Sequence, residues 1–232
     1  MSASFPEIIR LVSTLSVALP LFFYFKKYKH ATRALHLVGA LTLVAAFSDL
    51  LAYILFAQGK STIILFNIYY TTVFLLLSWF YYEILPTKGA KNLVIAGLFL
   101  YAAAFVVITS YFQSFFVYQT YMWSITGFFM IVYSMSYFFH LFSTQTTMSN
   151  FGLLTINSST LFYFSFNLFL FVMSSYVLLK MEHKIAFVIW SFHNINNIVR
   201  NVLIGLGISI YSKEGLTRPV YTNPGKRALH VS

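Results

Sequence analysis

The segment Trp190–Ile204 carries the polar side chains that are hardest to explain by apolar packing. It lies inside an apolar run long enough to cross a bilayer. Counted from His193, the residues at i+4, i+7 and i+8 are also polar, so they share one helical face. Polar groups at membrane depth are costly, and they usually face a bundle interior where they pair or bind a ligand or ion. The polar residues of the segment are His193, Asn194, Asn196, Asn197, Arg200 and Asn201.

The composition is typical of a polytopic membrane protein. Of 232 residues, 59% are hydrophobic, 20% aromatic and only 9% charged, whereas soluble domains carry about 25% charged residues. Cysteine is absent, which excludes a disulfide framework and a thiolate metal site. The net charge of +10 lies mainly in loops and a C-terminal segment. The inner leaflet accounts for basic residues in such places, so we expect no binding of nucleic acid.

Apolar segments of about 20 residues, the length that crosses a bilayer, occur seven times. We therefore expect an all-α bundle of seven transmembrane helices that fills residues 1–211 as one domain. A basic cytoplasmic tail, residues 212–232, is expected to be flexible or to lie on lipid headgroups. Pro20 should kink the first helix. The expected spans are Phe5–Phe25, Leu35–Ala57, Thr62–Ile84, Asn92–Phe112, Thr120–Phe142, Asn157–Leu179 and Ile185–Tyr211.

Lysine and arginine residues predict the orientation of the bundle. Ten of them lie on the side that follows the first, third and seventh spans, and four lie on the other side. Cytoplasmic loops carry an excess of these residues, so we expect the N-terminus outside and the C-terminus in the cytoplasm. The ten are Lys26, Lys27, Lys29, Arg33, Lys88, Lys91, Lys213, Arg218, Lys226 and Arg227, and the four are Arg10, Lys60, Lys180 and Lys184.

Depth estimates bring polar residues of several spans to similar levels. At about 1.5 Å per residue, Asp49 lies about 21 Å from the cytoplasmic end of its helix, Asn197 about 20 Å and His193 about 26 Å. Arg200 and Asn167 both lie about 15 Å from that end. An isolated buried charge is unfavourable, so we expect Asp49 and Arg200 to pair with support from asparagine and tyrosine side chains. The candidate site is Asp49, Asn67, Tyr70, Asn167, His193, Asn194, Asn197, Arg200 and Asn201.

Two interpretations of this network remain open. It fixes helix packing, because polar residues join transmembrane helices, or it forms a ligand site, an ion site or a switch. Glu83, at the cytoplasmic end of the third span, is expected to pair with a loop lysine. Gly205 and Gly207 are expected to allow close helix packing. The aromatic run Tyr163–Phe171 is expected to serve mainly as lipid face and packing.

The second span reads LVAAFSDLLAYIL, with one acidic residue opposite an asparagine-rich last span. In this it resembles the sodium-site region of class A G-protein-coupled receptors, through Asp49 and Asn197 or Asn201 alone. The NPxxY and DRY motifs of those receptors are absent, and the third span ends in YYEIL. The resemblance is therefore one of architecture.

The whole chain, with its short loops, many aromatic residues and polar last span, resembles the small heptahelical sensor-type membrane proteins of bacteria that accompany histidine kinases. This resemblance implies a location in the bacterial cytoplasmic (inner) membrane. It also implies a histidine kinase or another signalling protein, in the cytoplasm or the membrane, as partner.

The expected function is that of a receptor or sensor, which binds a small or apolar ligand in the helix bundle and signals to a partner protein. The alternative is a transporter or channel for a small solute or a proton, with Asp49, His193 and Arg200 along its path. No nucleophile–base pair or metal-ligand spacing stands out, so we expect no enzymatic activity and no metal. The last span has no lysine to hold retinal, and its one histidine differs from the zinc-binding cluster of hydrolases related to adiponectin receptors. We expect no cofactor.

Overall fold

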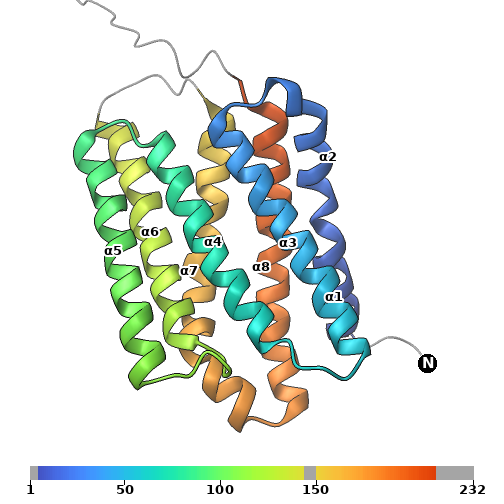
Figure 1. The fold of residues 1–232 in the computed structure, drawn as a ribbon. Coiled ribbons are helices and arrows are strands. Elements are labelled where there is room, and N and C mark those ends of the chain that lie inside the picture. Colours follow the sequence, from blue (N-terminus) through green and yellow to red (C-terminus); the bar gives the residue numbers. More distant parts are fainter. Residues whose placement is uncertain (1–4, 144–149, 213–232) are drawn as a thin grey trace, which may run out of the picture.

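The computed structural model describes residues 5–143 and 150–212, and every regular element in those ranges is helical. The helices run roughly side by side along one axis (Figure 1). The expected all-α class is thereby confirmed. The elements are α1 (Phe5–Ser16), α2 (Ala18–Lys27), the 3-10 helix η1 (Tyr28–His30), α3 (Arg33–Ala57), α4 (Ile63–Ile84), α5 (Lys88–Tyr111), α6 (Thr120–Ser143), α7 (Phe151–Lys180) and α8 (His183–Ile210).

Six helical segments in the described ranges are long and apolar enough to cross a membrane. They are α1 with α2 and η1, then α3, α4, α5, α6 and the first part of α7, and each has 22 to 26 residues. At 1.5 Å per residue this is about 33 to 39 Å, more than the roughly 30 Å of a hydrocarbon core. With 28 residues α8 is also long enough, but its polar segment makes it less apolar than the six.

The first expected span is broken, as the proline predicts. The α-helix is interrupted at Val17, between α1 and α2. Proline at position 20 has no N–H for the carbonyl of Ser16, four residues earlier, and its ring presses against that carbonyl. The break therefore lies three residues before the proline itself.

The seventh helix of the structure, α7, begins six residues before the expected Asn157. Asn150 caps it: the Asn150 Oδ1 accepts from the Leu153 N–H at 3.1 Å. The same side chain donates to the Ser212 carbonyl at 2.8 Å, which joins the start of α7 to the end of α8. The expected span began at Asn157, so Asn150 and its capping role were not predicted from the sequence.

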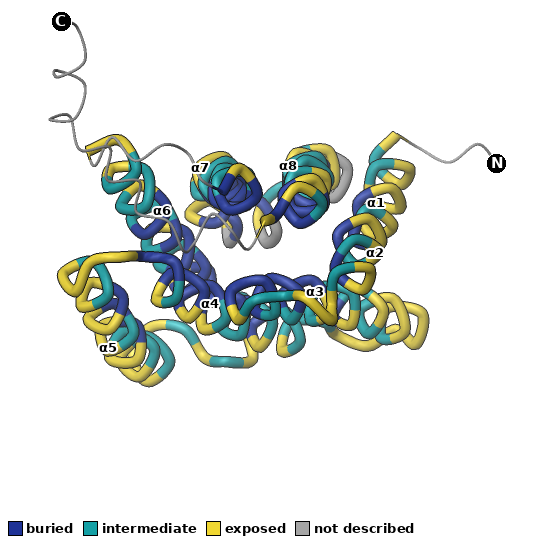
Figure 2. The backbone as a smooth tube through the Cα atoms, turned by 90° about the horizontal axis from the view of Figure 1, so that it is seen from above, coloured by how far each residue is buried: buried dark blue, intermediate teal, exposed yellow. Residues whose placement is uncertain are grey.

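The first helical segment (α1 with α2), α3, α4, α6, α7 and α8 form a closed circle, and α5 stands outside it. Seen along the axis, α7 and α8 lie opposite α4 and α3, with α6 at one end and α1 and α2 at the other (Figure 2). Neighbours around this circle are in contact, and α5 packs on α4 and α6. Buried residues face the inside of the circle (Figure 2). Residues brought to that interior by different helices can therefore meet.

The crossing of α7 and α8 is close because two glycines meet there. A Cβ atom on Gly152 would lie 2.6 Å from the Gly207 carbonyl oxygen, and one on Gly207 would lie 2.9 Å from the Gly152 carbonyl oxygen. The expectation that Gly207 allows close packing is confirmed. Gly205 faces the side chain of Leu19 instead, with its built Cβ 3.0 Å away.

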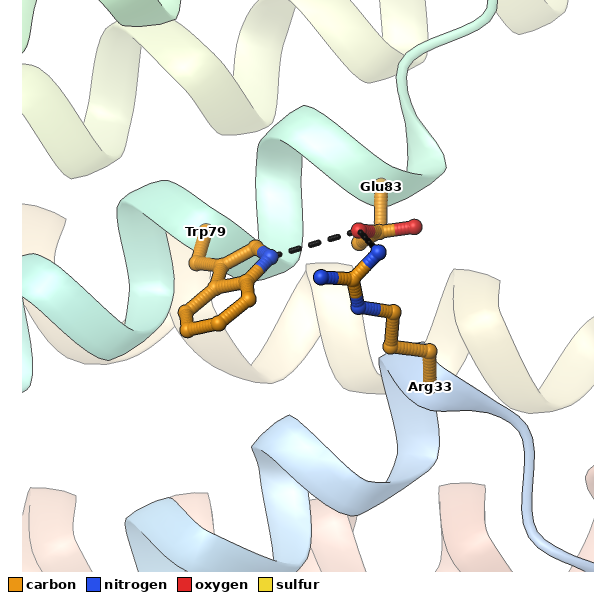
Figure 3. Close-up of polar contacts among 3 residues, drawn as sticks. All are labelled: Arg33, Trp79 and Glu83. Carbon is orange, nitrogen blue, oxygen red and sulfur yellow. Dashed lines mark hydrogen bonds and ion pairs between the residues drawn. The ribbon is translucent and has the colours of Figure 1, made fainter.

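At the basic end of the bundle, charged side chains join helix ends. The Lys27 ammonium donates to the carbonyls of Ser209 and Tyr211 at 2.7 and 3.0 Å, where the C-terminal dipole of α8 favours a cation. The Glu83 carboxylate pairs with Arg33 at 3.1 Å and accepts from the Trp79 indole N–H at 3.2 Å (Figure 3). The expected loop-lysine partner of Glu83 was wrong, because the first turn of α3 brings Arg33 nearer.

Candidate functional site

The polar face of α8 divides between two neighbouring helices. At about 100° per residue, His193 and Arg200 lie within about 20° of one another around the helix, while Asn201 is about 80° from His193. The first two side chains therefore turn toward α7, whereas Asn197 and Asn201 turn toward α1. One stripe of polar residues serves two different interfaces.

On the α7 side, His193 is held by a completely buried asparagine. The Asn167 amide nitrogen donates to the Tyr163 carbonyl at 2.8 Å, which fixes its oxygen as the atom that faces His193. The His193 Nδ1 lies 2.9 Å from this Oδ1 and so carries the proton. In the neutral ring Nε2 then remains an acceptor. The ring itself lies against Trp190, with centroids 5.0 Å apart.

Arg200 is buried among tyrosines. Only 3% of its surface is exposed, and its guanidinium carbon lies 4.7 Å from the centre of the Tyr163 ring. The guanidinium also interacts with the side chain of Tyr69 on α4. Stacking on an aromatic face stabilises a desolvated cation. Tyr69 and Tyr163 thus connect α4, α7 and α8 at one buried charge.

Tyr70 continues this cluster toward α6. Its ring lies 4.7 Å from the Trp123 ring and 5.2 Å from the Phe171 ring, centroid to centroid. Its hydroxyl group interacts with Tyr163. The Trp123 indole is 2% exposed, and its Nε1 donor has no acceptor among the described residues. The interior of the circle is therefore aromatic, with hydrogen-bonding groups inside it.

Asp49 does not touch Arg200. The carboxylate is half-buried on α3 and interacts electrostatically with Arg200. No ion pair joins the Asp49 carboxylate to the Arg200 guanidinium, both of which the structure describes. The expected contact pair is thus replaced by a longer-range interaction, and the tyrosines occupy the place next to the guanidinium.

On the α1 side, two asparagines of α8 form hydrogen bonds with two serines just before the break between α1 and α2. The Asn197 amide donates to the Ser13 hydroxyl at 3.0 Å, and the Asn201 amide donates to the Ser16 hydroxyl at 2.8 Å. These bonds join α8 to the last turn of α1. They belong to helix packing and not to the cluster around Arg200.

The last two candidates, Asn67 and Asn194, do not contribute to the polar contacts around Arg200 and His193. Asn67 is 2% exposed, but its amide donates to the carbonyls of Phe115 and Val117 at 2.8 Å and its oxygen accepts from the Gln119 N–H at 3.2 Å. It therefore holds the connection between α5 and α6. Asn194 is half-buried, and its side chain has no hydrogen bond with the part of the chain that the structure describes.

Tyr163 and a second buried polar cluster were not predicted from the sequence. Tyr163 belongs to the run that was expected to be lipid face and packing, yet it is 3% exposed and stands one turn before Asn167. That i, i+4 spacing was the available signal. In the second cluster, Asn157 accepts from the Tyr81 hydroxyl and from the Ser134 hydroxyl, both at 2.9 Å. An asparagine in an apolar segment was its signal.

The central arrangement offers hydrogen bonds and charge but no recognisable reaction centre. We call Tyr69, Tyr70, Trp123, Tyr163, Asn167, His193 and Arg200 the central cluster. It presents a cation, one imidazole acceptor and several aromatic faces in an apolar bundle. No group of three or more histidine, aspartate or glutamate side chains suited to a metal ion occurs among the described residues. Such a set can bind a small molecule by one polar end and an apolar body.

No protein-family model, curated protein or solved structure matches this chain.

Proposed function

We propose that this chain is a receptor or sensor of the membrane, which binds a small, largely apolar ligand at the central cluster and signals to a partner protein. The observation that carries the proposal is the buried Arg200, stacked on Tyr163 and 3% exposed, beside the imidazole of His193. Structural polar contacts elsewhere in the bundle, such as those of Asn157, use neutral groups with their partners in place. A buried cation without a contacting carboxylate is costly for packing alone.

The proposed topology has seven spans, with α8 as the seventh, the N-terminus outside and the C-terminus in the cytoplasm. The support for α8 is its 28-residue length and the contacts of His193 with α7 and of Asn197 with α1, which keep these polar groups away from lipid. The support for the orientation is the excess of basic residues at the end that carries Lys27, Arg33 and Lys88. We propose the bacterial inner membrane as its location.

The proposed partner is a signalling protein such as a histidine kinase. The path for a signal would be α8, because one helix contacts both the central cluster and the broken first span. A ligand that moved His193 or Arg200 would act on the same helix that holds Ser13 and Ser16. The break at Val17 gives the first span a place to bend.

A transporter or channel for a small solute or a proton is the second candidate. The observation that favours it is the half-buried Asp49 carboxylate. It interacts electrostatically with the Arg200 guanidinium but is not in contact with it. Ionisable groups inside a bundle also mark ion and proton paths. Under this alternative Asp49, His193 and Arg200 would lie along the path.

Native mass spectrometry of the delipidated protein tests ligand binding. We expect a discrete small-molecule adduct of fixed mass on the wild-type chain and its loss in His193→Leu, which removes the Asn167 contact from the cluster. His30→Leu is the matched control, because His30 is exposed at the end of the first span. Loss of the adduct in both variants would contradict the proposal. The absence of any adduct from the wild-type chain would contradict it as well.

Flux measurements separate the two candidates. The purified protein in proteoliposomes is assayed with a pH-sensitive dye for protons and with radiolabelled sugars, amino acids and carboxylates for solutes. A receptor gives no saturable flux. Saturable flux that is lost in Asp49→Asn would replace the receptor by the transporter.

A further inference from the structure

The central cluster contains the positive charge of Arg200, and no carboxylate of the described residues is in contact with it. Arg200 is the buried cation; its guanidinium carbon lies 4.7 Å from the centre of the Tyr163 ring, and the guanidinium interacts with the side chain of Tyr69. Asp49 interacts only at longer range and remains half-buried. An arginine offers five N–H donors in a planar fork. Two phenolic side chains leave part of that fork without an anionic partner.

Around this cation the cluster provides aromatic faces, an indole donor and the Nε2 acceptor of the neutral His193 ring. The Trp123 Nε1 donor is buried without an acceptor among the described residues. Tyr163 and Phe171 both contact the His193 ring, with centroids 5.9 and 6.0 Å away. The Nδ1 of that ring is already occupied by Asn167. The cluster therefore combines the guanidinium of Arg200 with several aromatic rings.

We propose that the ligand is an amphiphile with a singly charged anionic head group, which binds the Arg200 guanidinium while its apolar body lies against the aromatic rings. This inference rests on the proposed ligand-binding function and names the chemical class of the ligand. A carboxylate fits the planar fork through two parallel N–H···O bonds. The rings of Trp123, Tyr163 and Phe171 supply the apolar contact that a small inorganic anion would not use.

The ligand class suits the place of the cluster in the bundle. A molecule with an apolar body reaches the interior of a membrane bundle from the bilayer, where a free inorganic ion is scarce. A charged hydrogen bond between arginine and a carboxylate is worth more in such surroundings than in water. Replacing the head group by a neutral one should therefore lower affinity more than shortening the body by a methylene group.

Quenching of tryptophan fluorescence by 9,10-dibromostearate tests this proposal. The chain has three tryptophans, and Trp79 is exposed on the outside of the bundle. The measurement is therefore made on Trp79→Phe in a neutral detergent, so that Trp123 and Trp190 report. The matched neutral probe is 9,10-dibromostearyl alcohol. A brominated phosphatidylglycerol distinguishes a membrane lipid from a free acid as the source of the anionic group.

We expect saturable quenching by the acid, about 10- to 100-fold tighter than by the alcohol, as one charged hydrogen-bonding site gives. Arg200→Gln should abolish that difference, and Arg200→Lys should keep part of it. Arg33→Gln, an exposed arginine, is the control and should change nothing. Saturation by the brominated lipid with the same dependence on Arg200 would also support an anionic head group and assign it to a lipid.

Two results would overturn the proposal. Equal affinity for acid and alcohol on the parent protein is one, and it needs no folded variant. A preference for the acid that survives in folded Arg200→Gln is the other. Equal, saturable binding of both probes would still leave ligand binding standing, so failure of the anionic class is distinct from failure of the proposed function.

Discussion

At the scale of single residues, the position of Arg200 is set by aromatic side chains and not by a carboxylate. An arginine over the face of a tyrosine keeps its charge at low dielectric because the ring quadrupole attracts the cation. The contact partner on α7, Tyr163, is one helical turn from Asn167, so the same helix holds both His193 and Arg200. A single turn of α7 thus positions both His193 and Arg200 of α8.

This arrangement predicts weak coupling between Asp49 and Arg200. Breaking a contacting buried ion pair costs about 3–5 kcal/mol, but these two groups are not in contact. In a double-mutant cycle with Asp49→Asn and Arg200→Gln, we expect a coupling free energy below about 1 kcal/mol. Unfolding in mixed micelles of sodium dodecyl sulfate and a maltoside measures it. Coupling of several kcal/mol would show that the charges meet directly.

Asn157 gives a second prediction at this scale. Asn157→Ala would remove the acceptor of the buried Tyr81 hydroxyl, at a cost of about 1–3 kcal/mol, whereas the Ser134 hydroxyl would keep the Asn157 carbonyl, 3.1 Å away, as an acceptor. Thr155→Ala is the control, since that hydroxyl donates to the Phe151 carbonyl of its own helix. The same mixed-micelle unfolding compares them. Equal effects of the two substitutions would refute a special role for Asn157.

The sequence predicted which polar residues are buried better than it predicted their partners. Asn167, Arg200 and Asn201 are all buried, as their position in apolar segments indicates. Partners depend on which helices are neighbours, and helix depth alone does not contain that information. Asn67 shows this: it is buried in the bundle, as its depth indicated, but its amide donates to backbone carbonyls of the connection between α5 and α6.

At the scale of elements, periodicity and apolar length located the helices, while their ends depended on local hydrogen bonds. Pro20 predicted the break in the first span because a proline removes a donor wherever it stands. The start of α7 was missed because the Asn150 cap bonds to Ser212, a contact between segments far apart in the chain. Local chemistry is visible in sequence, and such distant contacts are not.

The crossing of α7 and α8 yields a third prediction. Gly152→Ala and Gly207→Ala should each destabilise the protein by about 1–3 kcal/mol, because a Cβ atom would strike the backbone of the other helix. Gly89→Ala is the control, with nothing within 4 Å of its built Cβ. It should be neutral or slightly stabilising, since alanine favours a helix. Thermal unfolding that ranks all three variants together would contradict the close crossing.

At the scale of the whole molecule, the closed circle of helices is what gathers the central cluster. The order around the circle brings α4 opposite α7 and α8 and places α6 between α4 and α7, so residues more than 100 positions apart meet (Figure 2). The helix order around a bundle follows from packing of surfaces that all look apolar in the sequence. Composition could therefore predict a membrane protein, but it could not predict that α5 would lie outside the circle.

The final prediction concerns α8 and decides between six and seven spans. If α8 crosses the membrane, fusions after Met181 and after Ser232 must report opposite sides, because α7 and α8 meet at the turn around Met181. The excess of basic residues near Lys27 and Lys88 places the Ser232 fusion in the cytoplasm. A fluorescent protein that folds only in the cytoplasm should therefore be bright at Ser232 and dark at Met181, and alkaline phosphatase should show the reverse. The same signal at both positions would mean that α8 does not span, and its asparagines and Arg200 would then have to reach water and not the interior of the bundle. Opposite signals with phosphatase active at Ser232 would keep seven spans and invert the orientation.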